Sequence, residues 1–418
     1  MPPMDAKPEP SPREPRDLRL LFSVQALRAT LYGFGSVLIG SALAGSGLSD
    51  LEVTSVFAAM LVGFALASIV VGTRGDRWGR RRTYTVLLLV LAAGGAVYAL
   101  STSLTFLILA ALTGTISVEA NESGPITSLE QAMIPQVTTD TQHRTRAFAR
   151  YNAVAYVAGS LGALAAGGPD FFRRYFPALP ASQRFLLAYP AIGLAAALLA
   201  TRLSPAVEAG EELTTSRRFP LVRSKGRVAG LSGLFALDSF GGGFVVSAFL
   251  VFWFHRRFGA STELLGVVFF AAGLLQAGSS LAAGWLANHI GMLNTMVFTH
   301  LPSNVLLILV PFMPALPWAI AMLLLRFTIS QMDVPARQAY VASVVDPTER
   351  TAAAAYTNTA RYVVRPFGQA LGGLSIQAIG LAAPLVIGGA IKIVYDLTLL
   401  ATFGHVRLRD EEATPRSG

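Results

Sequence analysis

Long apolar stretches divide the chain, and they constrain its fold more than any other feature. A helix that crosses a bilayer needs ~20 predominantly apolar residues, and twelve such stretches can be placed. They cover residues 20–42, 52–72, 84–102, 105–136, 147–167, 184–203, 228–252, 263–286, 293–313, 317–344, 351–378 and 381–403. Only 14% of the residues are Asp, Glu, Lys or Arg, against roughly 25% in soluble domains. The sequence therefore predicts an all-α integral membrane protein with twelve transmembrane helices.

A segment rich in glycine and arginine follows the second stretch and recurs in the second half. Residues 72–82 read Gly-Thr-Arg-Gly-Asp-Arg-Trp-Gly-Arg-Arg-Arg, and residues 284–291 repeat the spacing Gly-x3-[Asp/Asn]-x2-Gly 212 positions later. A second repeat, Asp-x3-Arg-Thr-x-Ala-x-Ala-x2-Asn, begins at Asp140 and returns 206 positions later at Asp346. Two repeats at similar offsets indicate two pseudo-symmetric six-helix halves.

The first of these segments resembles the loop between helices two and three of the major facilitator superfamily, G-x-L-[AG]-D-R-x-G-R-[RK]-x. The matching positions are Gly72, Gly75, Asp76, Arg77, Gly79, Arg80 and Arg81, and Arg74 stands where the family has Leu. The resemblance covers the whole transmembrane region. It implies the fold of that family, transport by alternating access and no cofactor.

The resemblance also implies a gating role for this loop. In the family, the Asp of the motif contacts the other half near the start of helix eleven and favours the outward-open state, and Asp76 is the matching residue. An acid at a helix N-terminus gains favourable dipole energy, which is lost when the halves separate. In the second half, the candidate gating residues are Gly284, Asn288 and Gly291.

Segments outside the spans set the domain boundaries. Residues 1–19 are rich in proline and charge and read as a disordered tail rather than a signal peptide. Residues 204–227 are polar and form the linker between the halves. The predicted halves are residues 20–203 and 228–403, and residues 404–418 form a second tail.

The net charge of +9 is distributed as in a membrane protein. About 22 of the lysines and arginines fall in segments on the side of the two tails and the linker, and about five on the other side. This pattern predicts cytoplasmic tails, a cytoplasmic linker and residence in the cell (cytoplasmic) membrane. The anionic inner leaflet, rather than nucleic acid, is the expected partner of this charge.

Ionisable residues within the spans indicate the candidate site. Such a group costs about 2.5–3.5 kcal/mol at the bilayer centre and persists where it serves a cavity or a partner. In the family, helices one, four, seven and ten line the central cavity. On these helices the candidate substrate and coupling residues are Glu119, Glu122, Arg28, Asp238, Asp333, Arg326 and Arg337.

Proline residues interrupt two of these helices at corresponding places. Gly124-Pro125 lies halfway along the fourth span, and Pro335 follows Asp333 in the tenth. Proline removes a helical hydrogen bond, and matching breaks in two halves point to a transporter binding site. We therefore expect the site between helices four and ten. An alternative stays open, in which these residues only cap kinked helices and Arg28 neutralises the acids of helix four in a buried ion network.

Glu119 and Glu122 are three residues apart and share one helical face. Two carboxylates this close in a low dielectric do not both ionise readily, so one is expected to gain and lose a proton. This pattern favours proton coupling over sodium coupling or facilitated diffusion.

The direction of transport depends on weaker signals. Drug–proton antiporters of the family carry G-x3-G-P-x2-G-G in helix five, and residues 159–168 lack its proline. The favoured function is proton-coupled efflux of a small organic solute by a monomer. Several arginines at membrane depth leave open a proton symporter that imports an anionic metabolite. A transport-dead sensor or scaffold is the alternative from another class, and no His-rich, Ser-His-Asp or cysteine constellation suggests an enzyme.

Three weaker patterns complete the prediction. Lys392 and Asp396, four residues apart in helix twelve, are expected to pair with each other outside the cavity. Arg361 and Arg365 fit either an anion contact or a pairing with Asp333. No metal site is predicted, because His289 and His300 lack carboxylate neighbours at ligand spacing.

Overall fold

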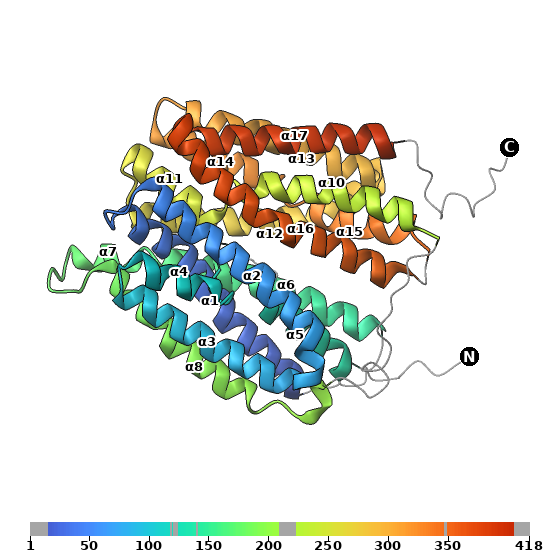
Figure 1. Ribbon diagram of the computed structural model, residues 1–418, viewed down its shortest axis with the longest axis horizontal. Coiled ribbons are helices and arrows are strands. Elements are labelled where there is room, and N and C mark those ends of the chain that lie inside the picture. Colours follow the sequence, from blue (N-terminus) through green and yellow to red (C-terminus); the bar gives the residue numbers. More distant parts are fainter. Residues whose placement is uncertain are drawn as a thin grey trace, which may run out of the picture.

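Helices make up every regular element in the part of the chain that the computed structural model describes. The described residues are 16–117, 119, 124–138, 141–208, 223–346 and 349–404. Glu122, most of both tails and most of the linker lie outside them. Figure 1 shows the helices in two groups, with the N-terminal half in blue to green and the C-terminal half in yellow to red.

The N-terminal half runs from the first predicted span to the sixth. Its helices are α1 (Arg16–Ala44), α2 (Asp50–Trp78), α3 (Arg80–Leu100), α4 (Leu104–Leu112), α5 (Pro125–Met133), α6 (Thr141–Ala165), α7 (Gly168–Arg173) and α8 (Ala188–Ala200). Short 3-10 helices are η1 (Ile134–Val137), η2 (Ser182–Leu187) and η3 (Pro205–Val207).

The C-terminal half repeats this order. Its helices are α10 (Lys225–Gly243), α11 (Ser247–Phe258), α12 (Thr262–Ile290), α13 (Met292–Leu309), α14 (Leu316–Phe327), α15 (Asp333–Val344), α16 (Arg350–Ala378) and α17 (Ala383–Phe403), with the 3-10 helix η4 (Val310–Phe312) after α13. Each of the twelve predicted spans therefore coincides with one helix or with two consecutive helices, and the predicted fold class is confirmed.

Eight of these spans are long and apolar enough to cross a membrane on length and composition alone, within the described residues. The other four form two pairs related by the repeat. The fourth and tenth spans are each divided into two short helices, α4 with α5 and α14 with α15. The fifth and eleventh are α6 and α16, which carry more polar residues. Polar character is thus concentrated in the same helices of both halves.

Glycines allow the first and fifth helices of each half to cross closely. An added Cβ at Gly33 of α1 would lie 1.8 Å from the carbonyl oxygen of Gly159 in α6. In the C-terminal half, a Cβ at Gly243 would lie 2.1 Å from the carbonyl oxygen of Arg365 in α16. Such close backbone approach is typical of small residues between membrane helices, and it supports a packing role for Gly243.

The two halves meet mainly through α1 with α11, α2 with α16 and α6 with α12. Two ion pairs join them at the end of the molecule opposite to the start of α1 and the end of α17, which is the left end in Figure 1. Arg256 lies 3.1 Å from Asp50, and Arg174 contacts Glu263. We call this the closed end.

Candidate functional site

A polar cavity of about 320 Å³ is bordered by residues of both halves. The described part of the N-terminal half contributes Glu119 and Tyr156 to its lining. The C-terminal half contributes polar and charged side chains from α10 to α17, chiefly Asp238, Ser239, Ser247, Gln276, His300, Arg326, Ser330, Gln331, Asp333, Arg337, Arg361, Tyr362, Arg365 and Lys392.

The helix breaks place two acids at this cavity. α5 begins at Pro125, where the missing N–H costs no helical hydrogen bond. Gly124 precedes it because an added Cβ would lie 2.0 Å from the ring of Phe64. Glu119 lies between α4 and α5, where the described residues, 113–117, 119 and 124, are not helical. Asp333 is the first residue of α15. Both predicted breaks are present.

Glu119 connects the two halves at the cavity. Its carboxylate lies 2.5 Å from the Arg365 guanidinium of α16 and accepts the backbone N–H of Ser247, at the start of α11, at 3.3 Å. The Ser247 hydroxyl also donates to it. A carboxylate at a helix N-terminus gains from the helix dipole. The acid is therefore held by one cation and one helix end of the opposite half.

Asp238 is the centre of a second cluster within the C-terminal half. Its carboxylate lies 2.6 Å from Lys392 Nζ, 3.5 Å from Arg337 and 3.8 Å from Arg361. Arg337 also pairs with Asp333 at 3.0 Å, one turn earlier on α15. Lys392 therefore binds Asp238 on α10 rather than Asp396 on its own helix, so the local pair expected from the sequence is not formed.

Positive charge exceeds negative charge among the described residues that line this cavity. The lining contains Arg326, Arg337, Arg361, Arg365 and Lys392, against Glu119, Asp238 and Asp333. Arg326 makes no hydrogen bond or ion pair with any described residue, and its Nε atom is buried without a partner. The Nε atom of Arg361 is also buried and unpaired within the described structure. These guanidinium groups present unused donors beside the cavity.

The N-terminal half contains a separate, enclosed network around Glu130 of α5. Glu130 is 0% exposed and lies 2.6 Å from the Arg28 guanidinium of α1. Tyr84 of α3 donates a hydrogen bond to it at 2.7 Å, and Tyr151 of α6 donates another. Arg28 also donates to Gln25. These residues do not line the cavity.

The structure thus separates the residues that the sequence grouped together. Five of them border the cavity: Glu119, Asp238, Asp333, Arg326 and Arg337. Arg28 lies in the enclosed network instead and pairs with Glu130, and Glu122 lies outside the described residues. The sequence interpretation left out His300 and Lys392, which reach the cavity from helices nine and twelve. Ionisable side chains inside apolar spans could have indicated a role in the cavity. They were left out because helices nine and twelve are not among the helices that line the cavity in the family.

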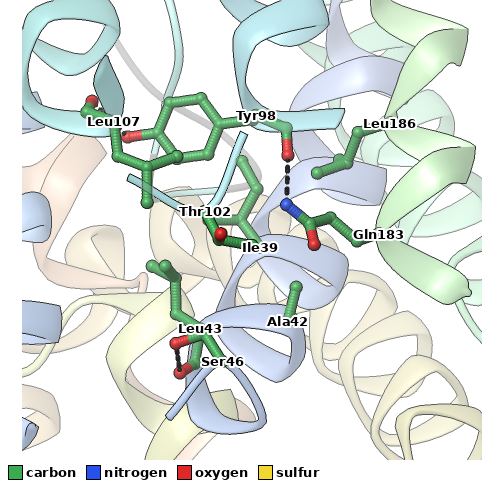
Figure 2. A pocket seen from close by; sticks show the side chains of 9 residues that line it. All are labelled: Ile39, Ala42, Leu43, Ser46, Tyr98, Thr102, Leu107, Gln183 and Leu186. Atoms are coloured by element: carbon green, nitrogen blue, oxygen red, sulfur yellow. Dashed lines mark hydrogen bonds between the residues drawn. The ribbon is translucent and has the colours of Figure 1, made fainter. Parts of the chain in front are cut away.

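Figure 2 shows a second, much smaller cavity near the closed end, lined by α1, the end of α3 and η2. Gln183 donates to the carbonyl oxygen of Tyr98 at 2.8 Å, and Tyr98 donates its hydroxyl hydrogen to the carbonyl of Leu107. Its volume of about 10 Å³ is that of a single water molecule. It therefore serves packing rather than substrate binding.

Comparison with known proteins identifies the family. Residues 21–369 match the family model described as Major Facilitator Superfamily. The chain belongs to the major facilitator superfamily. An uncharacterized membrane protein of Saccharomyces cerevisiae, YJR124C, is 26% identical to it over 422 residues, which cover 93% of this chain and 94% of that relative.

Solved transporters share the fold. The nucleoside transporter NupG superposes with a TM-score of 0.72 at 12% identity, covering 94% of this chain and 100% of NupG. A bacterial homologue of the human lysosomal transporter Spinster, in an inward-facing and unoccupied conformation, has a TM-score of 0.68 at 16% identity, with coverage of 94% and 96%. Together with the family match and the helices long and apolar enough to cross a membrane, this makes the molecule a multi-pass membrane protein of the superfamily.

The segment predicted as a loop is mostly helical, because α2 continues to Trp78 and α3 begins at Arg80, with only Gly79 between them. This segment is tied to its own half. Asp76 pairs with Arg80 at 2.8 Å, and Arg80 also donates to the carbonyl oxygen of Ala132 at 2.9 Å. Glu208, after η3, accepts the backbone N–H of Arg80 at 2.6 Å. Gly79 ends α2 with φ +85°, a conformation that favours glycine. Gly72 and Arg77 are exposed.

The second copy of the motif keeps the backbone geometry but not the charges. Gly291 ends α12 with φ +86°, matching Gly79. Asn288 is exposed, and a Cβ at Gly284 would meet nothing within 4 Å of the described structure. Asp76 therefore contacts its own half here, whereas ion pairs join the halves at the closed end.

Proposed function

We propose that this protein transports a small organic anion by alternating access, with the cavity around Asp238 and Arg326 as its binding site. The supporting observation is the excess of cationic side chains in a cavity that both halves border. Burying a charge without a partner costs several kcal/mol. An anion that enters the cavity supplies the missing partner.

Arginine suits this role because its guanidinium can bind a carboxylate or phosphate with two parallel hydrogen bonds. Arg326 and Arg361 have donors that the described residues leave unused. The volume of about 320 Å³ lies at the lower end of the range for ligand pockets. It suits a small metabolite rather than a large drug.

The charge of the cavity favours the anionic metabolite that the sequence left as an alternative. Proton coupling and efflux, which the sequence favoured, stay predictions. In this proposal, Glu119 acts in gating as well as in the lining, because its contacts with Arg365 and Ser247 join the halves and separate when the closed end opens.

We further propose that the linker and both tails are cytoplasmic and that the protein resides in the cell membrane. The arginine-rich segment of residues 72–82, where α2 ends and α3 begins, supports this orientation. With that orientation the closed end faces outward. Reporters fused after Arg227 and after Gly418 should be active only as cytoplasmic reporters. Activity of an extracytoplasmic reporter at either point would overturn the topology.

Matched ligand sets test the anion proposal. Purified protein is heated with carboxylates, amides and amines of the same shape: indole-3-acetate with indole-3-acetamide and tryptamine, benzoate with benzamide and benzylamine, and lactate with lactamide and 1-amino-2-propanol. We expect at least one carboxylate to raise the melting temperature while its amide and amine do not. Stabilisation by amines alone, or by no carboxylate, would contradict the proposal.

A further inference from the structure

A buried histidine lies between two carboxylates behind the cavity. His300 of α13 places Nδ1 2.8 Å from Asp396 Oδ1 and Nε2 3.6 Å from Asp238 Oδ1. Asp396 of α17 is 0% exposed and also accepts a hydrogen bond from Asn304 at 3.1 Å. His300 and Asp238 border the cavity, whereas Asp396 does not. The imidazole therefore bridges an enclosed acid and the binding site.

Other charged and titratable groups surround this bridge. Lys392 Nζ lies 3.4 Å from His300 Nε2 and 2.6 Å from Asp238. The ring of Tyr395 lies edge-on to the His300 ring, with centroids 5.9 Å apart. The groups that face the bridge are Lys392, Tyr395 and Asp396 from α17, Asp238 from α10, Asp333 and Arg337 from α15, and Arg361 from α16. The described residues hold no group of three or more His, Cys, Asp or Glu that could bind a metal ion.

We propose that His300 is the proton-binding group of this transporter and that its protonation strengthens anion binding in the cavity. The inference rests on the proposed anion transport. Imidazole changes charge near neutral pH. In neutral His300, the Nδ1–H donates to Asp396 and the Nε2 lone pair faces the Lys392 ammonium. Nε2 is thus the atom that takes up a proton from water in the cavity.

Protonation of His300 changes which cations neutralise the Asp238 carboxylate. The new Nε2–H points to Asp238 Oδ1, the oxygen that Lys392 now contacts. The imidazolium repels the nearby ammonium, so Lys392 is released toward the cavity that it borders. The binding site then carries one more positive charge that no acid balances. A proton and an anion therefore bind cooperatively, which links them as in a symporter rather than an antiporter.

Calorimetric titration of the purified full chain tests this linkage. The probe is indole-3-acetate, benzoate or lactate, whichever stabilises the protein most in the matched sets, and each stays ionised above pH about 5. We expect wild type to bind it about tenfold more tightly at pH about 5.5 than at pH about 8. Titrations in two buffers of different ionisation enthalpy should show uptake of about half a proton per anion at intermediate pH, as a tenfold change in affinity requires.

His300→Asn should bind the anion with little pH dependence and without proton uptake, while His289→Asn, an exposed histidine, should behave as wild type. Asp396→Asn should move the pH dependence to lower pH without removing it, because a carboxylate stabilises imidazolium. This variant keeps the test decisive if His300→Asn does not fold.

Three results would overturn the inference. The first is pH-dependent binding that persists in His300→Asn, and the second is loss of all pH dependence in Asp396→Asn, which would assign the proton to that acid. The third is pH-independent binding by wild type. Absence of any anion binding would instead contradict the proposed function, and the inference with it.

Discussion

The two halves contain the same ion pair with opposite polarity. In the N-terminal half, Arg28 of the first helix pairs with Glu130 of the fourth span. In the C-terminal half, Asp238 and Arg337 lie 210 and 207 positions later, in the corresponding helices, and also pair. Both pairs are buried, but only the second borders the cavity.

Their surroundings explain the difference. Two tyrosine hydroxyls complete the coordination of Glu130, so that pair is closed to a further ligand. Asp238 instead faces Lys392, Arg337 and Arg361, more cations than one carboxylate balances. Each half thus contains one buried ion pair at the same place in the repeat. The surrounding residues make the Arg28–Glu130 pair structural and the Asp238–Arg337 pair part of the proposed binding site.

The largest effect is expected from breaking the enclosed pair. Glu130→Gln leaves Arg28 buried without a counter-charge, which costs about 3–5 kcal/mol of stability. Its melting temperature and expression should fall far more than those of Asp238→Asn, where cavity water reaches the remaining cations. Equal losses in both variants would show that the two pairs do not differ as described.

Exchanging the charges sharpens the comparison. The double variant Arg28→Glu with Glu130→Arg restores an ion pair, and it should regain much of the stability lost in Glu130→Gln and keep anion binding. The matched exchange Asp238→Arg with Arg337→Asp alters the cavity lining and should lose anion binding even when it folds. Melting temperature and calorimetric affinity measure the two outcomes. Retained affinity in the second exchange would remove Asp238 from the site.

Arg326 should affect binding rather than stability. It has no ion-pair partner among the described residues, so Arg326→Gln removes an unbalanced charge without exposing an acid. Losing one charged hydrogen bond costs about 1.5–3 kcal/mol, so the anion affinity should fall roughly 10–150-fold. The melting temperature without ligand should stay the same or rise. A large drop in that temperature with unchanged affinity would assign Arg326 to the scaffold.

The smallest effect on anion binding is expected from changing Asp76 of the superfamily motif. Asp76 is partly exposed and does not line the cavity. Asp76→Asn should leave equilibrium anion binding within about a few-fold of wild type and still impair transport, because the superfamily uses this acid between states. Transport at the wild-type rate by this variant would contradict the gating role.

The sequence predicted the fold well because its signals are local. Each of the twelve predicted spans coincides with described helices, and eight of them are long and apolar enough to cross a membrane. Pro125 and Pro335 marked the breaks in the fourth and tenth spans, and the seventh span is also divided, between α10 and α11. The partners of the charged residues were harder to predict, since they depend on how helices pack. Lys392 and Asp396 are one turn apart, yet the first contacts Asp238 and the second contacts His300.

The partners of Arg28, His300 and Glu119 also depend on how the helices pack. Arg28 does not line the cavity, because tyrosines of α3 and α6 enclose its partner Glu130. His300 has no carboxylate at short spacing in the sequence, but two lie beside it in space. Glu119 pairs with Arg365, 246 residues away in the other half. Long-range pairings of this kind leave no periodic signal in a single sequence.

The central claim is that the cavity bordered by both halves carries a small organic anion. Counterflow exchange in proteoliposomes tests it most directly. Vesicles loaded with an unlabelled carboxylate take up the same labelled compound, with competing amide and amine of matched shape outside. We expect saturable exchange that the carboxylate inhibits and its amide and amine do not, and that Arg326→Gln weakens. Exchange inhibited equally by the amine, or unaffected by Arg326→Gln, would contradict the account.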